Sequence, residues 1–382
     1  MTAPLRIAIL GSTGSIGRQS LDVIARFPGQ FSVAALAAGQ NAGLLAEQVA
    51  RFNPMYVSSE RSSSLLESAV AATGARLIPM DELAVAEDVD LVLVGTAGAA
   101  GLGPTLRALE FGRPVAIANK EVLVMAGHLV RDAMRGRDLL RPVDSEHSAI
   151  WQCLWGESGH GIRRILLTAS GGAFRDFDQP QLAAVTPAQA LKHPTWNMGA
   201  KITVDCASLM NKGMETIEAM WLFDVPMERV EVVLHRESIV HSLVEFSDGS
   251  VKAQLGYPDM RLPIQCALAY PDRMSQPPVA PLDLASLGTL HFGEPDMSRF
   301  PCLRLAIMAG RTGGTMPAVM AAADEVAVSE FLSGRVGFLE IPSIIEAVME
   351  RHRPIPNPPL DAILEADSRA RLEALALAGA AV

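Results

Sequence analysis

The chain has 382 residues, of which 49% are hydrophobic and 19% charged, and a formal net charge of −10. That length exceeds one ordinary core, so two or three domains are expected, and the composition excludes a disordered chain. The negative charge excludes a general affinity for nucleic acid but not a small phosphorylated substrate, which a few lysines and a helix N-terminus can bind.

The first part of the chain alternates between strand-like and helix-like patterns. Short apolar runs typical of buried parallel strands are followed by amphipathic stretches. Strands are expected at 6–10, 31–39, 90–98 and 114–119, and helices at 15–27, 41–52 and 103–112. This alternation predicts an α/β unit with a Rossmann-like, doubly wound parallel sheet.

The pattern then changes to an α+β texture. Antiparallel strands are expected within 163–174 and 230–256, with a hairpin turn at Asp248-Gly249, and one helix over 206–223. A Pro-rich stretch is followed by Ala-rich helical sequence. The predicted division is a cofactor-binding domain at 1–144, a central α+β catalytic domain at 145–269, a connector at 270–297 and a C-terminal helical bundle domain at 298–382.

The four cysteines are widely scattered and have neither metal-site nor redox spacing. A cytoplasmic protein is expected, because a reducing compartment suits unpaired thiols. No signal peptide is expected, because the N-terminal residues read directly as a strand, and no apolar run reaches the ~18 residues of a membrane span.

Glycines mark a predicted phosphate loop between the first strand and helix. Gly11, Gly14 and Gly17 form G-x-x-G-x-x-G, which is one residue longer than the usual dinucleotide fingerprint. Glycines there allow the backbone to approach a pyrophosphate at a helix N-terminus. Ser12, Thr13 and Ser15 are expected to add hydroxyl donors. An ordinary tight turn is the competing explanation.

The end of the second strand indicates which dinucleotide binds. NAD sites usually place an acidic residue there, to hold the ribose 2′-hydroxyl. This strand ends in Ala38-Gly39-Gln40-Asn41, so NADP is favoured, with these residues capping a helix that faces the 2′-phosphate. Gln40 is not the cation that would have strengthened the prediction.

Asp144 and Glu146 lie two residues apart before an apolar run. In an extended segment both carboxylates would share a face, which is unfavourable unless a cation or a shared proton relieves their repulsion. The alternative is that they form an N-cap and a first-turn acid of a helix.

Downstream, Asn211, Lys212 and Glu215 have the spacing of one helix face, so Glu215 offers a third carboxylate. Three oxygen ligands suit Mg²⁺ or Mn²⁺. Glu218 is a rival third ligand, and a solvated surface acid is the plainer explanation of Glu215.

Further polar residues cluster near expected loops. Ser170 stands beside two glycines and could bind phosphate, or simply make a turn. Lys192–Gly199 carries Trp196 in a loop that could close over a ligand, unless the indole packs on the core. Asn119-Lys120-Glu121 follows a strand, where open α/β sheets bind ligands, although a salt-bridged helix start would look the same.

Taken in order, "GSTGSIG", "ANKE", "VDSEH", "TASGG", "KHPTW", "NKGME" and "LGYPDMRLPI" resemble the 1-deoxy-D-xylulose 5-phosphate reductoisomerase family over about residues 6 to 350. The resemblance implies isomerisation of a phosphorylated sugar, by retro-aldol cleavage and re-addition, and reduction with NADPH to 2-C-methyl-D-erythritol 4-phosphate. It also implies dependence on Mg²⁺, Mn²⁺ or Co²⁺, and a homodimer, whose interface we expect at the middle-domain strands.

The resemblance also assigns site residues. The implied metal ligands are Asp144, Glu146 and Glu215. The implied substrate contacts are Lys120, Ser145, Glu146, Ser170, His193, Trp196 on the flap, Cys206, Asn211, Lys212 and Glu215, of which Lys120 and His193 join the metal ligands as catalytic residues. The implied NADPH contacts are Thr13, Gly14, Ser15, Ile16, Gly39, Gln40, Asn41, Asn119, Glu121 and Gly199, with Met198 and Met260 near the nicotinamide.

The sequence departs from the family pattern in several places. Cys206 replaces a usual serine, which predicts weaker phosphate binding, since a thiol is a poorer donor than a hydroxyl. Gln40 replaces a Lys, Arg or Ser, which predicts a reduced preference for NADPH over NADH. "HRES" at 235–238 replaces "HPQS", and Asp324 replaces an asparagine.

Two rival functions stay open at this point. An NADP-linked aldehyde or semialdehyde dehydrogenase would need an activated cysteine, and Cys206 has the one plausible position. A non-catalytic NADP-binding sensor would have no use for the three carboxylates.

Overall fold

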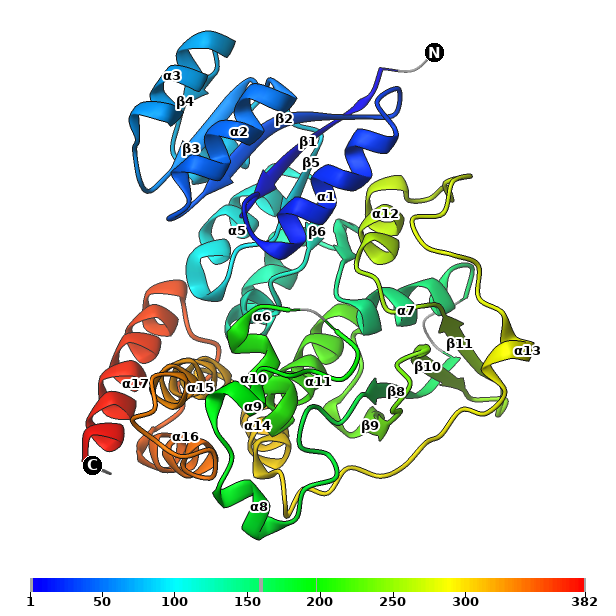
Figure 1. Ribbon diagram of the computed structural model, residues 1–382, viewed down its shortest axis with the longest axis vertical. Coiled ribbons are helices and arrows are strands. Elements are labelled where there is room, and N and C mark those ends of the chain that lie inside the picture. The colour runs from blue at the N-terminus through cyan, green and yellow to red at the C-terminus, as the bar shows by residue number, and fades with distance from the viewer. Residues whose placement is uncertain (1–2, 158–160, 197, 381–382) are drawn as a thin grey trace. The chain divides into compact units, whose positions relative to one another are not determined.

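The computed structural model describes residues 3–157, 161–196 and 198–380. The chain forms two compact units, coloured along the chain in Figure 1. Unit 1 comprises Met1–Val122, Leu129–Ser148 and Asp259–Pro281, and unit 2 comprises Leu123–His128, Ala149–Pro258 and Leu282–Val382. The predicted division at 144, 269 and 297 stays a prediction.

Unit 1 contains a seven-stranded sheet in the order β4-β3-β2-β1-β5-β6-β7, and every strand pair is parallel. The strands are β1 (Leu5–Leu10), β2 (Phe31–Ala38), β3 (Tyr56–Ser59), β4 (Arg76–Leu77), β5 (Leu91–Val94), β6 (Val115–Ile117) and β7 (Leu140–Pro142). The strand order reverses between β1 and β5, which is where such sheets bind ligands at their carboxyl ends. The predicted doubly wound sheet is confirmed.

The helices associated with this sheet follow the expected alternation. They are α1 (Ser15–Arg26), α2 (Ala42–Phe52), α3 (Ser64–Thr73), α4 (Met80–Leu83), η1 (Gly98–Gly101), α5 (Leu102–Phe111), α6 (Lys120–Met134) and α12 (Arg261–Ala269). Helix α12 comes from far along the chain, yet Ile264 and Leu268 share the core of unit 1 with Leu21 and Ile24 of α1. The chain therefore returns to unit 1 after building part of unit 2.

Unit 2 contains a four-stranded sheet in the order β11-β10-β8-β9. Its strands are β8 (Ile162–Ala169), β9 (Val230–Leu234), β10 (Val240–Phe246) and β11 (Val251–Leu255). The predicted hairpin is confirmed between β10 and β11, with Gly249 at φ +86°. The expectation of antiparallel strands throughout is wrong for β8 and β9, which pair in parallel. The long helical connection between them permits this, because parallel neighbours need a crossover.

The remaining helices lie in unit 2, apart from the first residues of α7, which belong to unit 1; residues 123–128 of α6 also belong to unit 2. The remaining helices are α7 (Ser145–Leu154), α8 (Gln179–Ala183), α9 (Pro187–Ala190), α10 (Ala200–Ser208), α11 (Met210–Phe223), η3 (Met227–Arg229), α13 (Leu284–Leu287), α14 (Pro301–Thr312), α15 (Met316–Leu332), α16 (Glu340–Arg351) and α17 (Leu360–Ala380). The predicted C-terminal helical part is confirmed. Within the described ranges, no helix is both long and apolar enough to cross a membrane.

The single helix expected over 206–223 is wrong. The chain instead breaks between α10 and α11 at Leu209, whose φ is +62°. A leucine in this left-handed region is strained, and hydrophobicity patterns do not reveal such a break. The break sets a new direction for α11 immediately before Asn211 and Lys212.

Candidate active site

The glycines of the first loop in unit 1 allow neighbouring backbone segments to pack closely. Gly11 has φ +86°, and a Cβ built there would lie 2.5 Å from the carbonyl oxygen of Gly95, in the loop after β5. A Cβ at Gly17 would lie 2.4 Å from the carbonyl oxygen of Gly11. The loop, the following turn of α1 and the β5 loop are therefore as close as backbones permit, as a dinucleotide fold requires.

The exposed residues of this loop are those expected to meet the cofactor. Gly14 is the N-cap of α1, and among the residues that the structure describes no side chain caps this helix, so its first-turn N–H groups suit a pyrophosphate. Ser15 is exposed and Thr13 and Ile16 are half-buried. The expectation for Ser12 is wrong: its hydroxyl is buried and donates to Gln48 Oε1 at 2.7 Å, so it holds the loop together.

The end of β2 has the predicted form. The side chain of Asn41 accepts a hydrogen bond from the backbone N–H of Leu44 at 3.1 Å and so caps α2. Gln40 is exposed, and its amide contacts Glu60 and Arg61 from the loop after β3. Sequence reasoning missed both of these neighbours, because they follow a different strand.

Asn119 lies at the carboxyl end of β6, as predicted. Its side chain is buried, and its amide donates to Thr96 Oγ1 at 3.1 Å and to the carbonyl of Gly98 at 3.0 Å. Its buried Oδ1 has no hydrogen-bond partner within the described residues. A group that offers a donor, such as a carboxamide, fits this acceptor. Glu121 follows in the first turn of α6.

The segment of Asp144 and Glu146 is not extended, so that part of the prediction is wrong. Asp144 instead directly precedes α7: its backbone carbonyl accepts the N–H of Ser148 at 2.8 Å and its Oδ1 accepts the N–H of Ser145 at 2.9 Å, while Glu146 lies in the first turn. The Ser145 hydroxyl donates to Glu146 at 2.6 Å. Lys120 Nζ lies 2.5 Å from Asp144 Oδ2. The helix-cap role and a metal-ligand role are therefore compatible.

Helix α11 presents the other carboxylate. Asn211 donates to Glu215 Oε1 at 2.6 Å, and the Lys212 ammonium forms a short ion pair with the other oxygen. All three side chains are buried. The predicted shared helix face is confirmed, and in this state Asn211 and Lys212 both contact Glu215.

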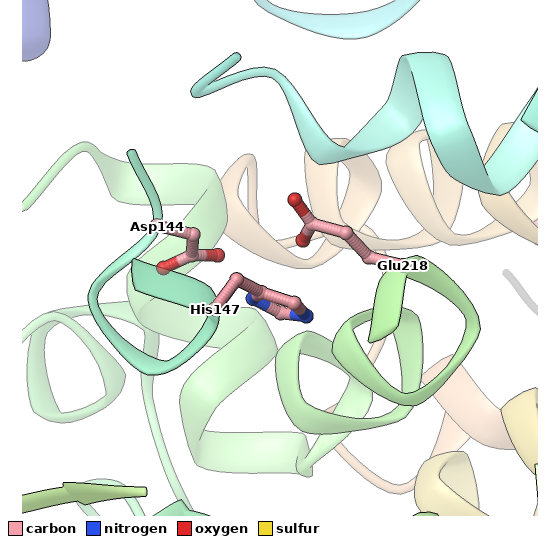
Figure 2. A group of neighbouring side chains, drawn as sticks. All are labelled: Asp144, His147 and Glu218. Carbon is pink, nitrogen blue, oxygen red and sulfur yellow. The ribbon is translucent and has the colours of Figure 1, made fainter. Parts of the chain in front are cut away.

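The carboxylates at the start of α7 and on α11 form two overlapping clusters. Single ligand atoms of Asp144, Glu146 and Glu215 all lie within 4.8 Å of one another, and so do those of Asp144, His147 and Glu218. Figure 2 shows the second cluster, with Asp144 just before α7, His147 on α7 and Glu218 on α11. The first cluster offers oxygen atoms alone, which suits a hard divalent cation. Glu218 thus remains a structural rival of Glu215.

Packing within unit 2 positions α7 relative to α11. Ile150 and Cys153 of α7 share a buried core with Ala219 of α11 and Phe246 of β10.

The loop after β8 forms an anion-binding candidate. The Ser170 hydroxyl lies 3.0 Å from His193 Nε2 and accepts the N–H of Gly172 at 3.2 Å. Gly172 has φ +69°, and a Cβ there would lie 2.4 Å from the carbonyl of Cys206. The glycine turn therefore brings Ser170 and His193 to the end of α10, where Cys206 is half-buried.

The hydrogen bonds of His193 determine its tautomer. Its Nδ1 accepts the backbone N–H groups of Thr195 at 3.2 Å and Trp196 at 2.9 Å, so the proton of the neutral ring lies on Nε2 and points to Ser170. Burial, and to a lesser degree the charge of Arg175, lowers the pKa of His193 to about 4. The imidazole is therefore neutral at pH 7.

The flap residues have mixed environments. Trp196 is half-buried, with its ring centroid 6.3 Å from that of His241. Met198 is half-buried, and Gly199 is the exposed N-cap of α10. Met260 belongs to unit 1 and packs against its core.

Sequence reasoning missed two residues near Ser170 and Trp196. The Arg175 guanidinium donates to the carbonyl of Ser170 at 2.9 Å and fixes the glycine turn. An arginine five residues beyond Ser170 was the available signal. His241 is buried on β10, and its burial lowers its pKa to about 4.

The cysteines do not support nucleophilic catalysis at three of their four positions. Burial raises the pKa of Cys153 and Cys266 to about 11, and it raises that of Cys302 further. Thiols held in this way are poor nucleophiles at neutral pH.

A Rossmann-like unit with a glycine loop, an acid-free second strand and a carboxylate cluster defines the class: a metal-dependent, NADP-linked oxidoreductase. Family models match residues 7–127 (1-deoxy-D-xylulose 5-phosphate reductoisomerase), 140–223 (its C-terminal domain) and 255–373 (DXP reductoisomerase C-terminal domain).

Individual proteins agree with these models. The chain is 52% identical over 371 residues to the reductoisomerase of Geobacillus kaustophilus, covering 96% of this chain and 97% of that protein. It is 53% identical over 374 residues to that of Pelotomaculum thermopropionicum, covering 96% of each. The chain belongs to the 1-deoxy-D-xylulose 5-phosphate reductoisomerase family.

Solved structures show the same fold. The Zymomonas mobilis enzyme in complex with NADPH matches with a TM-score of 0.90 and 41% identity, covering 99% of both chains. A DOX-P reductoisomerase in complex with NADPH, fosmidomycin and magnesium matches with a TM-score of 0.92 and 37% identity, covering 98% of both chains.

Proposed function

We propose that the chain isomerises 1-deoxy-D-xylulose 5-phosphate and reduces the product with NADPH to 2-C-methyl-D-erythritol 4-phosphate, with a divalent metal ion as cofactor. The observation that carries this proposal is the oxygen cluster of Asp144, Glu146 and Glu215, whose ligand atoms lie within 4.8 Å of one another. Family membership supplies the substrate, and the acid-free end of β2 favours NADPH.

The metal would supply Lewis acidity at the substrate oxygens, and NADPH would supply hydride. The chain itself supplies the carboxylates that would bind the metal and the lysines that neutralise them. Lys120 pairs with Asp144 and Lys212 with Glu215, so each ammonium group offsets the negative charge of its carboxylate. Lys120 is thus a positioning residue for Asp144, with its own substrate contact still proposed from the resemblance.

The phosphate of the substrate would bind in unit 2. The neutral His193 carries its proton on Nε2 beside the Ser170 hydroxyl, so both groups can donate to a phosphate oxygen. Lys212 and Asn211 would complete the site by turning from Glu215 to the phosphate, while Trp196 and Gly199 of the flap would meet substrate and NADPH respectively. Phosphate binding energy can then help close the flap.

The first test measures NADPH absorbance with 1-deoxy-D-xylulose 5-phosphate, with Mn²⁺ and then with excess chelator. Absorbance decay that requires both substrate and metal is expected. A folded protein that binds NADPH but gives no decay with any divalent metal would overturn the proposal and favour the sensor.

A second test decides between the two overlapping clusters. Glu215→Gln is expected to lower kcat at least about 100-fold and to weaken Mn²⁺ binding in titration calorimetry, because a first ligand is lost. Glu218→Gln is the matched control, and Mn²⁺ should bind it as tightly as wild type. The reverse result would transfer the metal to Asp144, His147 and Glu218.

The dehydrogenase rival has a separate test. An enzyme that uses a cysteine nucleophile loses its activity without the thiol. Full catalytic turnover in Cys206→Ala is expected here, with a changed Michaelis constant at most. Loss of turnover at saturating substrate would favour the dehydrogenase.

The remaining features of the proposal concern assembly, metal and location. Strand β11 is an edge strand with Val251–Ala253 exposed and, among the described strands, with β10 as its one neighbour, so we place the homodimer contact there. Sedimentation of a Val251→Lys variant as a monomer would support this edge. Mn²⁺ and Mg²⁺ both fit the oxygen ligands. Four free cysteines fit a cytoplasmic location.

A further inference from the structure

The adenosine end of the cofactor site lacks an expected cation. Gln40, at the turn after β2, is neutral, whereas a 2′-phosphate carries a charge of roughly −1.5 to −2 at neutral pH. The cap of α2 by Asn41 leaves the helix N-terminus as the local positive end. A helix dipole alone discriminates weakly between NADP and NAD. The preference for NADP therefore depends on whether a cationic side chain lies near the 2′-phosphate.

Strand pairing brings an arginine to this turn. Strands β2 and β3 are parallel, with Ala38 opposite Ser59, so the residues after both strands leave the sheet at the same edge. The Ser59 hydroxyl donates to the carbonyl of Arg61 at 2.6 Å and shapes the loop. The guanidinium Nε of Arg61 then donates to Gln40 Oε1 at 2.6 Å.

The amide of Gln40 connects two opposite charges. Its Nε2 donates to Glu60 Oε2 at 3.0 Å, while its Oε1 accepts from Arg61. Because a guanidinium can only donate and a carboxylate can only accept, the two partners determine the orientation of the amide. Within residues 3–157, 161–196 and 198–380, Arg61 uses Nε alone for hydrogen bonds, so both of its Nη groups stay available.

We propose that Arg61 supplies the positive charge that binds the 2′-phosphate of NADPH in place of a cation at position 40, and that Glu60 opposes it. This inference rests on the proposed use of NADPH. A guanidinium binds phosphate through paired N–H groups. Glu60 repels that phosphate and instead suits a ribose 2′-hydroxyl, as acids do in NAD sites. The balance of the two side chains sets nucleotide preference.

The test uses two nucleotides that differ by one phosphate, adenosine 2′,5′-bisphosphate and adenosine 5′-monophosphate, in titration calorimetry without substrate or metal. Arg61→Gln is expected to weaken binding of the bisphosphate at least about 10-fold and to leave the monophosphate within about twofold, since a charge-assisted bond is lost. Glu60→Gln should strengthen bisphosphate binding a few-fold.

The matched control is Arg51→Gln, which removes the same charge from the last turn of α2, at the opposite end from Asn41. It should change neither affinity. The ratio of kcat/KM for NADPH to that for NADH should fall in Arg61→Gln by the same factor as bisphosphate binding.

An Arg61→Gln protein that keeps the wild-type affinity ratio, or loses both affinities equally, overturns the inference while NADPH-dependent reduction by wild type still stands. A wild-type protein that binds neither nucleotide overturns the inference, and the proposed function falls with it only if NADPH-dependent reduction by wild type is also absent.

Discussion

The imidazole of His193 is held neutral by its hydrogen bonds as well as by burial. A proton added to Nδ1 would break the bonds that it accepts from Thr195 and Trp196. The ring therefore presents its Nε2–H to Ser170, and its orientation depends on the backbone of Thr195 and Trp196. Motion of the flap and orientation of this donor should change together.

A pH prediction follows from the lowered pKa of His193. The folded pKa is about 4 against an ordinary 6.5, so the unfolded chain binds more protons between these values and stability falls as pH falls from 6.5 toward 4. We expect His193→Gln to reduce the loss between pH 7 and pH 5 by about 1 kcal/mol, discounted for partial exposure. Urea unfolding of both proteins at both pH values checks this.

His241 remains in both proteins and contributes a slope of the same sign, because its pKa is also lowered to about 4. The free energy of unfolding of His193→Gln should therefore fall less steeply with decreasing pH than that of wild type, but it should still fall. An equal pH dependence of stability in the two proteins would contradict the contribution assigned to His193.

Cys206 offers a prediction about substrate binding. A hydroxyl donates to phosphate more strongly than a thiol, so Cys206→Ser should lower the Michaelis constant about 3- to 10-fold with kcat nearly unchanged. Steady-state kinetics with varied 1-deoxy-D-xylulose 5-phosphate measure it. Cys266→Ser, on α12, is the control and should leave the constant unchanged. An unaltered Michaelis constant in Cys206→Ser would refute the prediction.

At the scale of elements, α10 and α15 are joined by a buried charge group. Lys201 Nζ lies 2.6 Å from Asp205 Oδ2 and 2.8 Å from Asp324 Oδ2, and both carboxylates are buried. Asp324 is the residue that departs from the usual asparagine. Its charge makes Lys201 the ion-pair partner of two acids, so the helix that follows the flap is tied to the helical core by one ammonium.

Lys201→Met should therefore lower the free energy of unfolding by about 3–5 kcal/mol, because it removes a cation from buried carboxylates. Adding Asp324→Asn to this variant should recover part of the loss. Lys252→Met breaks a surface ion pair with Glu157 and should cost less than about 1 kcal/mol. Chemical denaturation compares them, and equal losses for both lysines would argue against a buried network.

Features that depend on neighbouring residues could be predicted from the sequence. Features that depend on contacts between distant segments could not. The strand-loop-helix start around Gly11, the hairpin at Gly249 and the face shared by Asn211 and Glu215 follow from neighbouring residues. The break at Leu209 and the contact of Arg61 with Gln40 depend on strands and helices that meet only in the fold. The extended path expected at Asp144 was wrong because α7 begins at the next residue, and the carbonyl of Asp144 accepts its first helical hydrogen bond.

For the whole molecule, metal binding should increase the stability of the folded state. An ion that binds the folded state alone stabilises it by about 2.7 kcal/mol at a concentration 100 times its dissociation constant. Saturating Mg²⁺ should therefore raise the thermal midpoint of wild type by about 2 °C or more, and leave Asp144→Asn unchanged. Scanning calorimetry measures both.

Glu228→Gln, which removes an exposed acid on η3, should keep the full Mg²⁺ shift. An undiminished shift in Asp144→Asn would mean that the ion stabilises the protein from somewhere else.

The return of the chain to unit 1 at α12 has a consequence during synthesis. A ribosome delivers α1 early, but Ile264 and Leu268, which complete its core, emerge only after most of the β8–β11 sheet unit. Until then the nascent chain exposes the apolar side of α1, which invites aggregation or chaperone binding. The nucleotide-binding unit, although encoded first, is thus completed only after much of the second unit has been translated.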